Sequence, residues 1–422
     1  MMNTNSTKRF LCRAIFLALG LLPLVGTFSW AAYRGLNQTN TSYAQWIGEQ
    51  FGLECSIQKV IHARPGTLRL EGLSFQDAES LRRLGHCNEA IIQFDSIKRV
   101  IHIPSLLVVD SEFRRLLELL DERVLQNPRI LELPTAVQIE ELTIQSNDSP
   151  AVTLRDIRLD TSLTDVGPQA NAKFTLIPES GSSGVAHEPI RMDVIRETAM
   201  TRAGSRGASS PPIPPVTKLN LLTGNARLPG RLLAGFFGSN HLGPTTTFQG
   251  NIHLDSNDRG SGAWTGDVSG HLDNLQLEDI CSMATGEAKL TFRKATFDKG
   301  VATLLDGTLA VGSGKLRSEF VESAIQNLGV TIAEGYRDQL TSGFLPFDAL
   351  NVDFVIENGQ SSLRGTVPQG SPGDIAIVHG ESLLSQPPSS VTNVDLLRTL
   401  LGLTQEQIPV ANDSALLRAI PQ

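Results

Sequence analysis

The stretch HARPGTLRLEGLSFQD, residues 62–77, decides the fold class, because its apolar residues alternate twice in different phases. Leu68 and Leu70 are separated by one polar residue, as in a strand with one buried face. Two residues intervene, and Leu73 and Phe75 then alternate in the opposite phase. A β-bulge would keep all four on one apolar face and bend the strand, whereas a regular strand would cross from one apolar surface to another.

The same spacing, apolar-x-apolar-x-x-apolar-x-apolar, recurs along the chain. The full copies contain Val137, Ile139, Leu142 and Ile144, and Val152, Leu154, Ile157 and Leu159. A weaker copy contains Leu290, Phe292, Ala295 and Phe297, and a partial one Leu272, Leu275 and Leu277. The central pairs, such as Glu71-Gly72, are poor two-residue hairpin turns. We therefore predict bent strands and not hairpins.

Further strands and a few helices complete the expected secondary structure. Alternating or clustered apolar residues between turn signals predict strands at 172–178, 247–255, 300–311 and 349–367. Apolar residues at helical spacing predict helices at 111–128, 314–329 and 392–402. So many short strands indicate a mainly β protein, and strands bent alike would form an elongated, curved antiparallel sheet with a few capping helices.

The length and composition of the chain limit the classes of function that it is suited to. The chain has 422 residues, of which 40% are hydrophobic and 19% charged, with a formal net charge of −8. This length suffices for two or three domains, and the acidic balance argues against nucleic acid as a partner. Of four cysteines, Cys55 and Cys87 would be able to pair in an oxidising compartment, although buried free thiols are the commoner arrangement.

The strongest signal precedes the strands. Residues 14–33 contain no charge, and a helix of that length spans ~30 Å, the hydrocarbon thickness of a bilayer. Lys8, Arg9 and Arg13 precede it, which keeps the N-terminus in the cytoplasm. The predicted anchor residues include Leu17, Leu21, Leu24 and Trp30. A cleaved signal peptide is the alternative, but bulky Trp30 stands where cleavage favours small residues.

A short amphipathic helix is predicted directly after the anchor. Tyr43, Trp46, Ile47 and Phe51 form an apolar stripe, Ser42 and Gln45 resemble a capping box, and Gly52 suits the helix end. This helix would lie on the membrane surface or cap the domain that follows.

The predicted organisation has seven parts. They are a cytoplasmic tail (1–10), a transmembrane signal anchor (11–33), a juxtamembrane helix (34–52), an N-terminal β-rich module (53–177), a Gly/Ser/Pro-rich loop or linker region (178–217), a C-terminal β-rich module (218–385) and a C-terminal helix and tail (386–422).

No catalytic or metal motif emerges from the sequence. The histidines lack HExxH spacing, and a pairing of His253 with His271 across a sheet is the nearest approach to a metal site. Lys315 in GTLAVGSGKL lacks the following Ser or Thr of a phosphate-binding loop, and the loop from Asp255 lacks the closing Glu of a calcium site. We predict a non-enzymatic protein without a cofactor.

The order of these segments resembles the AsmA-like envelope proteins, a group that includes TamB-type proteins. The resemblance rests on the anchor followed by residues 42–80, on IHIPSLL (101–107), on LPGRLLAGFFG (228–238) leading into FQGNIHLD (248–255), and on residues 344–366. It implies an elongated sheet curled into a groove with an apolar inside, in a protein that handles phospholipid or supports outer-membrane biogenesis.

The functional prediction joins this resemblance to the bent strands. The expected groove residues are Leu68, Leu70, Leu73, Phe75, Val137, Ile139, Val152 and Leu154. The protein would be anchored in the inner membrane with most of its chain in the periplasm, and its partners would be the membrane, phospholipid and other envelope proteins. Three alternatives remain: an ordinary sandwich core, an anchored interaction module that binds no lipid, and export in a eukaryotic cell with Asn37 and Asn40 as glycosylation acceptors.

Overall fold

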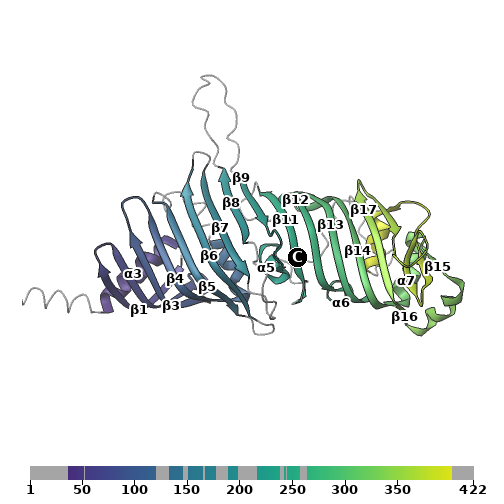
Figure 1. Ribbon diagram of the computed structural model, residues 1–422, viewed down its shortest axis with the longest axis horizontal. Helices are drawn as coiled ribbons and strands as arrows, with labels where there is room; N and C mark the ends of the chain where they lie inside the picture. Colours follow the sequence, from purple (N-terminus) through teal and green to yellow (C-terminus); the bar gives the residue numbers. More distant parts are fainter. Residues whose placement is uncertain are drawn as a thin grey trace, which may run out of the picture.

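The fold is one long sheet. The computed structural model describes residues 37–51, 53–119, 133–145, 151–164, 167–176, 189–197, 216–237, 242–243, 245–256 and 264–401. Strands dominate these residues and join in a single 21-stranded, mostly antiparallel sheet that runs the length of the molecule (Figure 1). The mainly β prediction is confirmed. The predicted anchor lies outside the described residues, within which no helix has the length and apolarity to span a bilayer.

The first half of the sheet follows the chain strand by strand. Its strands are β1 (Leu53–Arg64), β2 (Thr67–Asp77), β3 (Arg83–Phe94), β4 (Arg99–Val109), β5 (Thr135–Gln145), β6 (Val152–Leu163), β7 (Pro168–Leu176), β8 (Ile190–Glu197) and β9 (Val216–Leu222). Only the β4–β5 pair is parallel among the described strand pairs. β8 lies inside the region 178–217 suggested as a linker and joins β7 to β9 in the sheet.

The second half begins where β9 pairs with β11. Its strands are β10 (Leu228–Pro229), β11 (Thr247–Ser256), β12 (Trp264–Gln276), β13 (Ala284–Asp298), β14 (Val301–Arg317), β15 (Thr331–Ile332), β16 (Phe344–Phe347), β17 (Ala349–Glu357), β18 (Gln360–Gly365), β19 (Asp374–Val378), β20 (Glu381–Ser385) and β21 (Val391–Thr392). The long strands follow the order β11, β12, β13, β14, β17 and β18, and the short ones gather at the C-terminal end.

The described helices are short and lie at the ends and along one face. They are α3 (Asn37–Phe51), η2 (Asp110–Glu112), α4 (Phe113–Leu119), α5 (Gly230–Phe237), α6 (Leu277–Ile280), α7 (Ser318–Ser323), η5 (Ala324–Leu328), η6 (Glu334–Ser342) and α8 (Asn393–Leu401). Ser42 lies inside α3, so the predicted capping box with Gln45 is wrong. The helix expected from residue 314 starts at Ser318, because the preceding residues pair with β16 as part of β14.

The change of phase seen in residues 62–77 crosses six strands at the same level. Lys59 pairs with Glu71 and Glu71 with Glu89, while Ser105 pairs with Glu141 and Glu141 with Arg155. The change of phase occurs at the same level in every strand from β1 to β6. The pairing between neighbouring strands therefore continues across this level without a register shift. Each of these segments is one unbroken strand, as the bent-strand prediction requires.

The slip ends between β6 and β7. β6 has two residues between Arg155 and Arg158 where β7 has one between their partners Thr175 and Lys173. This is a one-residue bulge, and Asp156 within it has a left-handed φ of 52°. Similar irregularities recur in the second half, where Asn274 (φ 56°) lies at a register shift between Leu272 and Leu275. Bulges bend a strand, so they supply curvature to the sheet.

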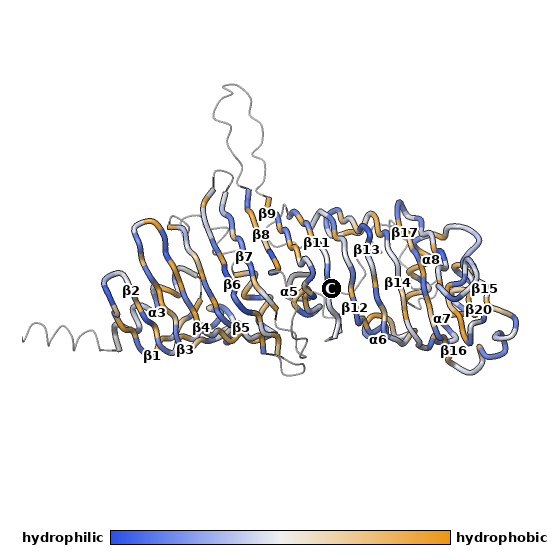
Figure 2. The backbone as a smooth tube through the Cα atoms, in the orientation of Figure 1, coloured by the Kyte–Doolittle hydropathy of each residue, from blue (hydrophilic) through white to orange (hydrophobic). Residues whose placement is uncertain are grey.

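The buried residues form two apolar clusters. The first lies on one face of β1 to β11, against α3, α4 and α5. The second lies at the C-terminal end, among β14, β16, β19 and β20 with α7, η5 and α8. Hydrophobic and hydrophilic residues alternate along the strands (Figure 2), so one face of the sheet is mainly apolar along its length. We call it the inner face.

Candidate functional site

The predicted groove residues all lie on the inner face of the first half. Leu68, Leu70, Val152 and Leu154 are buried, with 7%, 0%, 6% and 5% of their surface exposed. Leu73, Phe75, Val137 and Ile139 are half-buried. Leu70 and Leu73 belong to the same cluster although they stand on opposite sides of the slip. Gly72, between them, has a left-handed φ of 64°, a conformation that glycine adopts without strain.

Sequence reasoning missed the intervening strands of the same face. Ile101, Ile103, Leu106 and Val108 on β4 repeat the spacing of the quoted copies, so the signal was present. On β1 and β3 the inward positions carry smaller or polar residues, which weakens the pattern. They are Cys55, Ile57, Val60 and His62 on β1, and Gly85, Cys87, Ala90 and Ile92 on β3.

In the second half the inner face is built from rows of residues that cross the strands. One row pairs Ile252, Val268, Ala295, Leu305 and Ile356 in succession. The next row pairs Gly250, Gly270, Phe292, Gly307 and Phe354. Such rows run along the length of the molecule, so the apolar surface is a strip perpendicular to the strands.

Phenylalanine rings cover glycines in this strip. A Cβ added to Gly307 would stand 2.8 Å from the ring of Phe354 and 2.3 Å from the carbonyl oxygen of Thr291. Gly314 is covered in the same way by Phe347, and Gly85 by Phe75. Each ring therefore occupies the space next to a glycine where another residue would place its own side chain. The inner face stays apolar at these positions.

The strip is covered unevenly. In the first half, Ala44 and Ile47 of α3 and Leu232 and Leu233 of α5 are buried in its cluster. In the middle strands some inward side chains, such as Ile252, Leu272 and Ala295, are buried. Others stay half-buried, and these are Trp264, Val268, Phe292, Leu305 and Phe354. The middle of the inner face is therefore an apolar surface that the described residues leave partly open.

A cleft of about 840 Å³ opens at the N-terminal end of the strip. Tyr43 and Trp46 of α3, His62, Leu68 and Phe94 form part of its wall. The Tyr43 hydroxyl lies 3.4 Å from Nε2 of His62, and the rings of Trp46 and Phe94 are 6.1 Å apart. The stripe predicted on α3 thus faces the sheet and lines this cleft.

Arg99 lies behind these two rings. Its guanidinium carbon is 5.7 Å from the ring centres of both Trp46 and Phe94, a distance at which a cation and an aromatic face attract. Burial lowers the pKa of Arg99 from its ordinary value. A partly desolvated positive charge therefore lies beside two of the rings that form the wall of the cleft.

The two thiols in the first half do not form a disulfide. Cys55 pairs with Phe75 and Cys87 pairs with Leu73, so β2 separates the two cysteines. Two strand spacings amount to about 10 Å, beyond the ~7 Å that a disulfide can bridge. Both thiols are free, and burial raises the pKa of each to about 11. They remain protonated at neutral pH and act as small apolar groups.

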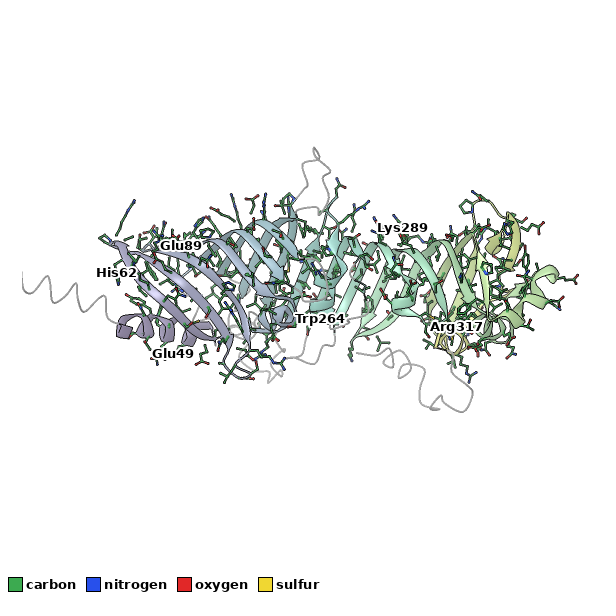
Figure 3. All side chains as sticks on the ribbon, turned by 90° about the horizontal axis from the view of Figure 1, so that it is seen from below. Glu49, His62, Glu89, Trp264, Lys289 and Arg317 are labelled. Atoms are coloured by element: carbon green, nitrogen blue, oxygen red, sulfur yellow. The ribbon has the colours of Figure 1, made fainter. Side chains whose placement is uncertain are left out.

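The outer face is polar. It carries ion pairs between neighbouring strands. Nε of Arg69 lies 3.0 Å from Oε1 of Glu89, Nη2 of Arg155 lies 3.4 Å from Oε2 of Glu141, and Nζ of Lys289 lies 3.0 Å from Oδ1 of Asp273. Figure 3 shows Glu89 and Lys289 along one side of the sheet and Trp264 on the other. Exposed pairs of this kind add little stability, but they keep the outer face solvated.

The described residues contain no cluster of three or more metal-ligating side chains. His253 pairs with Asp267 and His271 pairs with Gln249, so the two histidines stand four residues apart along their strands and do not meet. The inner face offers apolar contact and little polar chemistry.

Comparisons with protein-family models, curated proteins and solved structures gave no match for the chain.

Proposed function

We propose that the inner face is a lipid-binding groove and that the chain is a membrane-anchored, non-enzymatic AsmA-like protein that handles phospholipid in the cell envelope. The observation that carries the proposal is the half-open apolar strip of the middle strands. Soluble monomers rarely expose contiguous apolar patches beyond a few hundred Å². Such a surface favours an apolar occupant, and lipid is the one that a membrane supplies.

The dimensions of the strip suit acyl chains. The strands from β1 to β18 that follow one another in the sheet extend for roughly 70 Å at a spacing of ~4.8 Å. The half-open part from β11 to β17 crosses five strands, or roughly 19 Å. A bilayer core of two acyl chains end to end is ~30 Å thick, so this part has room for about one acyl chain length. Each methylene transferred from water contributes ~0.8 kcal/mol, so chains would bind without a dedicated polar site.

The predicted anchor supports the assignment of the compartment. It directly precedes α3, and α3 packs on β1 at one end of the strip. An anchored chain would therefore begin its groove, with the cleft of Tyr43 and Trp46, beside the inner membrane. Transport of phospholipid and support of outer-membrane biogenesis are both consistent with this arrangement.

Lipid extraction from the purified full chain tests the proposal. The full chain, exchanged into a synthetic detergent, should retain phospholipid detectable by native mass spectrometry. Val268→Arg places a charge on the half-buried middle of the inner face and should reduce the bound lipid. Ser269→Arg, the neighbouring residue on the outer face, is the matched control and should not. A folded wild-type protein without lipid would overturn the proposal.

One observation favours the alternative, an interaction module that binds no lipid. At the C-terminal end the chain itself occupies the inner face, since Ala376, Val378 and Leu383 are exposed by 4% or less. A protein segment is thus an acceptable occupant of this surface. Lipid-free protein with an intact fold would point to a protein partner.

A further inference from the structure

A buried cation interrupts the apolar inner face. Arg196 is the last inward residue of β8, following Ile190, Met192 and Val194 at alternate positions, and only 7% of its surface is exposed. Its Nη1 donates a hydrogen bond of 2.7 Å to Oγ1 of Thr217 on the adjacent strand. Among the described residues no carboxylate pairs with it. A guanidinium has five N–H donors, and no nitrogen of Arg196 is among the fully buried atoms that lack a partner, so the donors not engaged with Thr217 are open to solvent or a ligand.

The nearest carboxylate in the sequence is committed elsewhere. Glu197 follows Arg196 and points to the outer face, where its Oε1 lies 2.7 Å from Nζ of Lys218. Two neighbouring cations therefore differ in their environment. Lys218 is paired in water on the outer face, whereas Arg196 is buried on the inner face.

The surroundings of Arg196 change from polar to apolar within one step along the strands. Arg196 pairs with Thr217, and Thr217 pairs with Ser256, so two hydroxyl residues continue its row. In the adjacent row, Val194 pairs with Leu219 and Leu219 with Leu254. A charged and hydroxyl-bearing edge thus borders the apolar strip. This is the arrangement that an amphiphile requires, with its head at the edge and its chains along the strip.

We infer that Arg196 binds the oxyanion of an anionic lipid head group, a phosphate or a carboxylate, while the acyl chains lie on the strip. The inference rests on the proposed function and specifies its substrate class. A guanidinium that little water reaches is stabilised by an anionic partner, and its planar fork donates two parallel hydrogen bonds to carboxylate or phosphate oxygens. Thr217 orients the guanidinium by occupying Nη1.

Competition between lipids tests this inference on the full chain in detergent. The protein is incubated with an equimolar mixture of phosphatidylglycerol, oleate and dioleoylglycerol, which has no oxyanion, and bound lipid is counted by native mass spectrometry. An anionic species should exceed dioleoylglycerol about tenfold, since one charge-assisted hydrogen bond contributes that much. Enrichment of phosphatidylglycerol would identify phosphate as the head group, and enrichment of oleate would identify carboxylate.

Variants separate head-group selection from lipid binding. Arg196→Met should abolish the preference while total bound lipid is retained, and Arg196→Lys, which keeps the charge but loses the fork, should reduce it. Lys218→Met is the matched control and should keep the wild-type preference. Equal binding of all three lipids by the wild type, or an unchanged preference in a folded Arg196→Met, overturns the inference and leaves the lipid groove intact. Wild-type protein that binds no lipid overturns both.

Discussion

The middle and the C-terminal end of the molecule both carry an apolar inner face, but other segments cover this face more completely at the C-terminal end. At the C-terminal end β19 and β20 are covered on the inner face, and Val378 is 4% exposed. In the middle, Val268 and Phe292 occupy equivalent inward positions and stay half-buried. Apolar alternation therefore makes an inner face everywhere, and coverage by other segments decides whether it is a core or an available surface.

A charge placed in each region should break this comparison most strongly. Val378→Asp buries a carboxylate in the C-terminal apolar cluster and should lower the free energy of unfolding by about 4 kcal/mol or more. Val268→Asp should cost only about 1 kcal/mol, because solvent reaches the middle strip. Urea denaturation of both variants measures the difference. Equal losses would mean that the middle strip is as closed as the end.

Truncations on the two sides of the slip in β2 should give the next largest effect. Leu70 is fully buried, so Leu70→Ala should lower the free energy of unfolding by about 3 kcal/mol. Leu73→Ala should cost roughly half as much, because Leu73 is half-buried on the same face. Thermal unfolding followed by circular dichroism provides the measurement. A neutral Leu73→Ala would show that this side chain contributes nothing to the shared cluster.

Glycine substitutions on β14 test the covered backbone of the middle strip. In Gly307→Ala the new methyl group would meet Phe354 and the carbonyl of Thr291, so we expect a loss of about 2 kcal/mol. Gly312→Ala is the control, since nothing lies within 4 Å of its added Cβ, and its effect should stay within about 0.5 kcal/mol. Chemical denaturation of the pair is sufficient. The idea fails if the two variants unfold at the same denaturant concentration.

The smallest expected effect concerns acid stability of the turn after β2. The Ser80 hydroxyl donates a 2.7 Å hydrogen bond to Asp77 and chiefly lowers the pKa of that carboxyl, with smaller contributions from the Ser80 amide and Arg115. A carboxyl whose pKa is lowered in the folded state stabilises the fold above its ordinary pKa of ~3.9. That stability is lost as the pH falls through the lowered value.

Asp77→Asn should therefore remove part of the decline in stability below pH 4. Melting temperatures between pH 2 and 7 would show it as a flatter profile than that of the wild type. Asp338→Asn, in the exposed η6 turn, is the control and should leave the profile unchanged. An Asp77→Asn profile parallel to the wild type would assign the acid sensitivity to other groups.

Some elements were beyond sequence reasoning for identifiable reasons. No helix was predicted at residues 228–238, yet they contain the helix α5, whose Leu232 and Leu233 are buried against the sheet. β8 lies among Gly, Ser and Pro-rich stretches that hid it, and Arg196 was overlooked with it. In both cases the secondary structure depends on contacts with segments that are distant in the sequence. Local composition does not reveal those contacts.

The sequence by itself determined the strands, the apolar face and the change of phase, because side-chain alternation is a property of the strand itself. The sequence also shows Cys55 and Cys87. It does not show that strand β2 lies between them and keeps the two thiols apart. Only the tertiary structure decided that six slips share one level, that α3, α4 and α5 cover the first half, and that β19 closes the end. Register and coverage depend on which segments meet across long stretches of chain, and a pattern with a period of two residues carries no information about those partners.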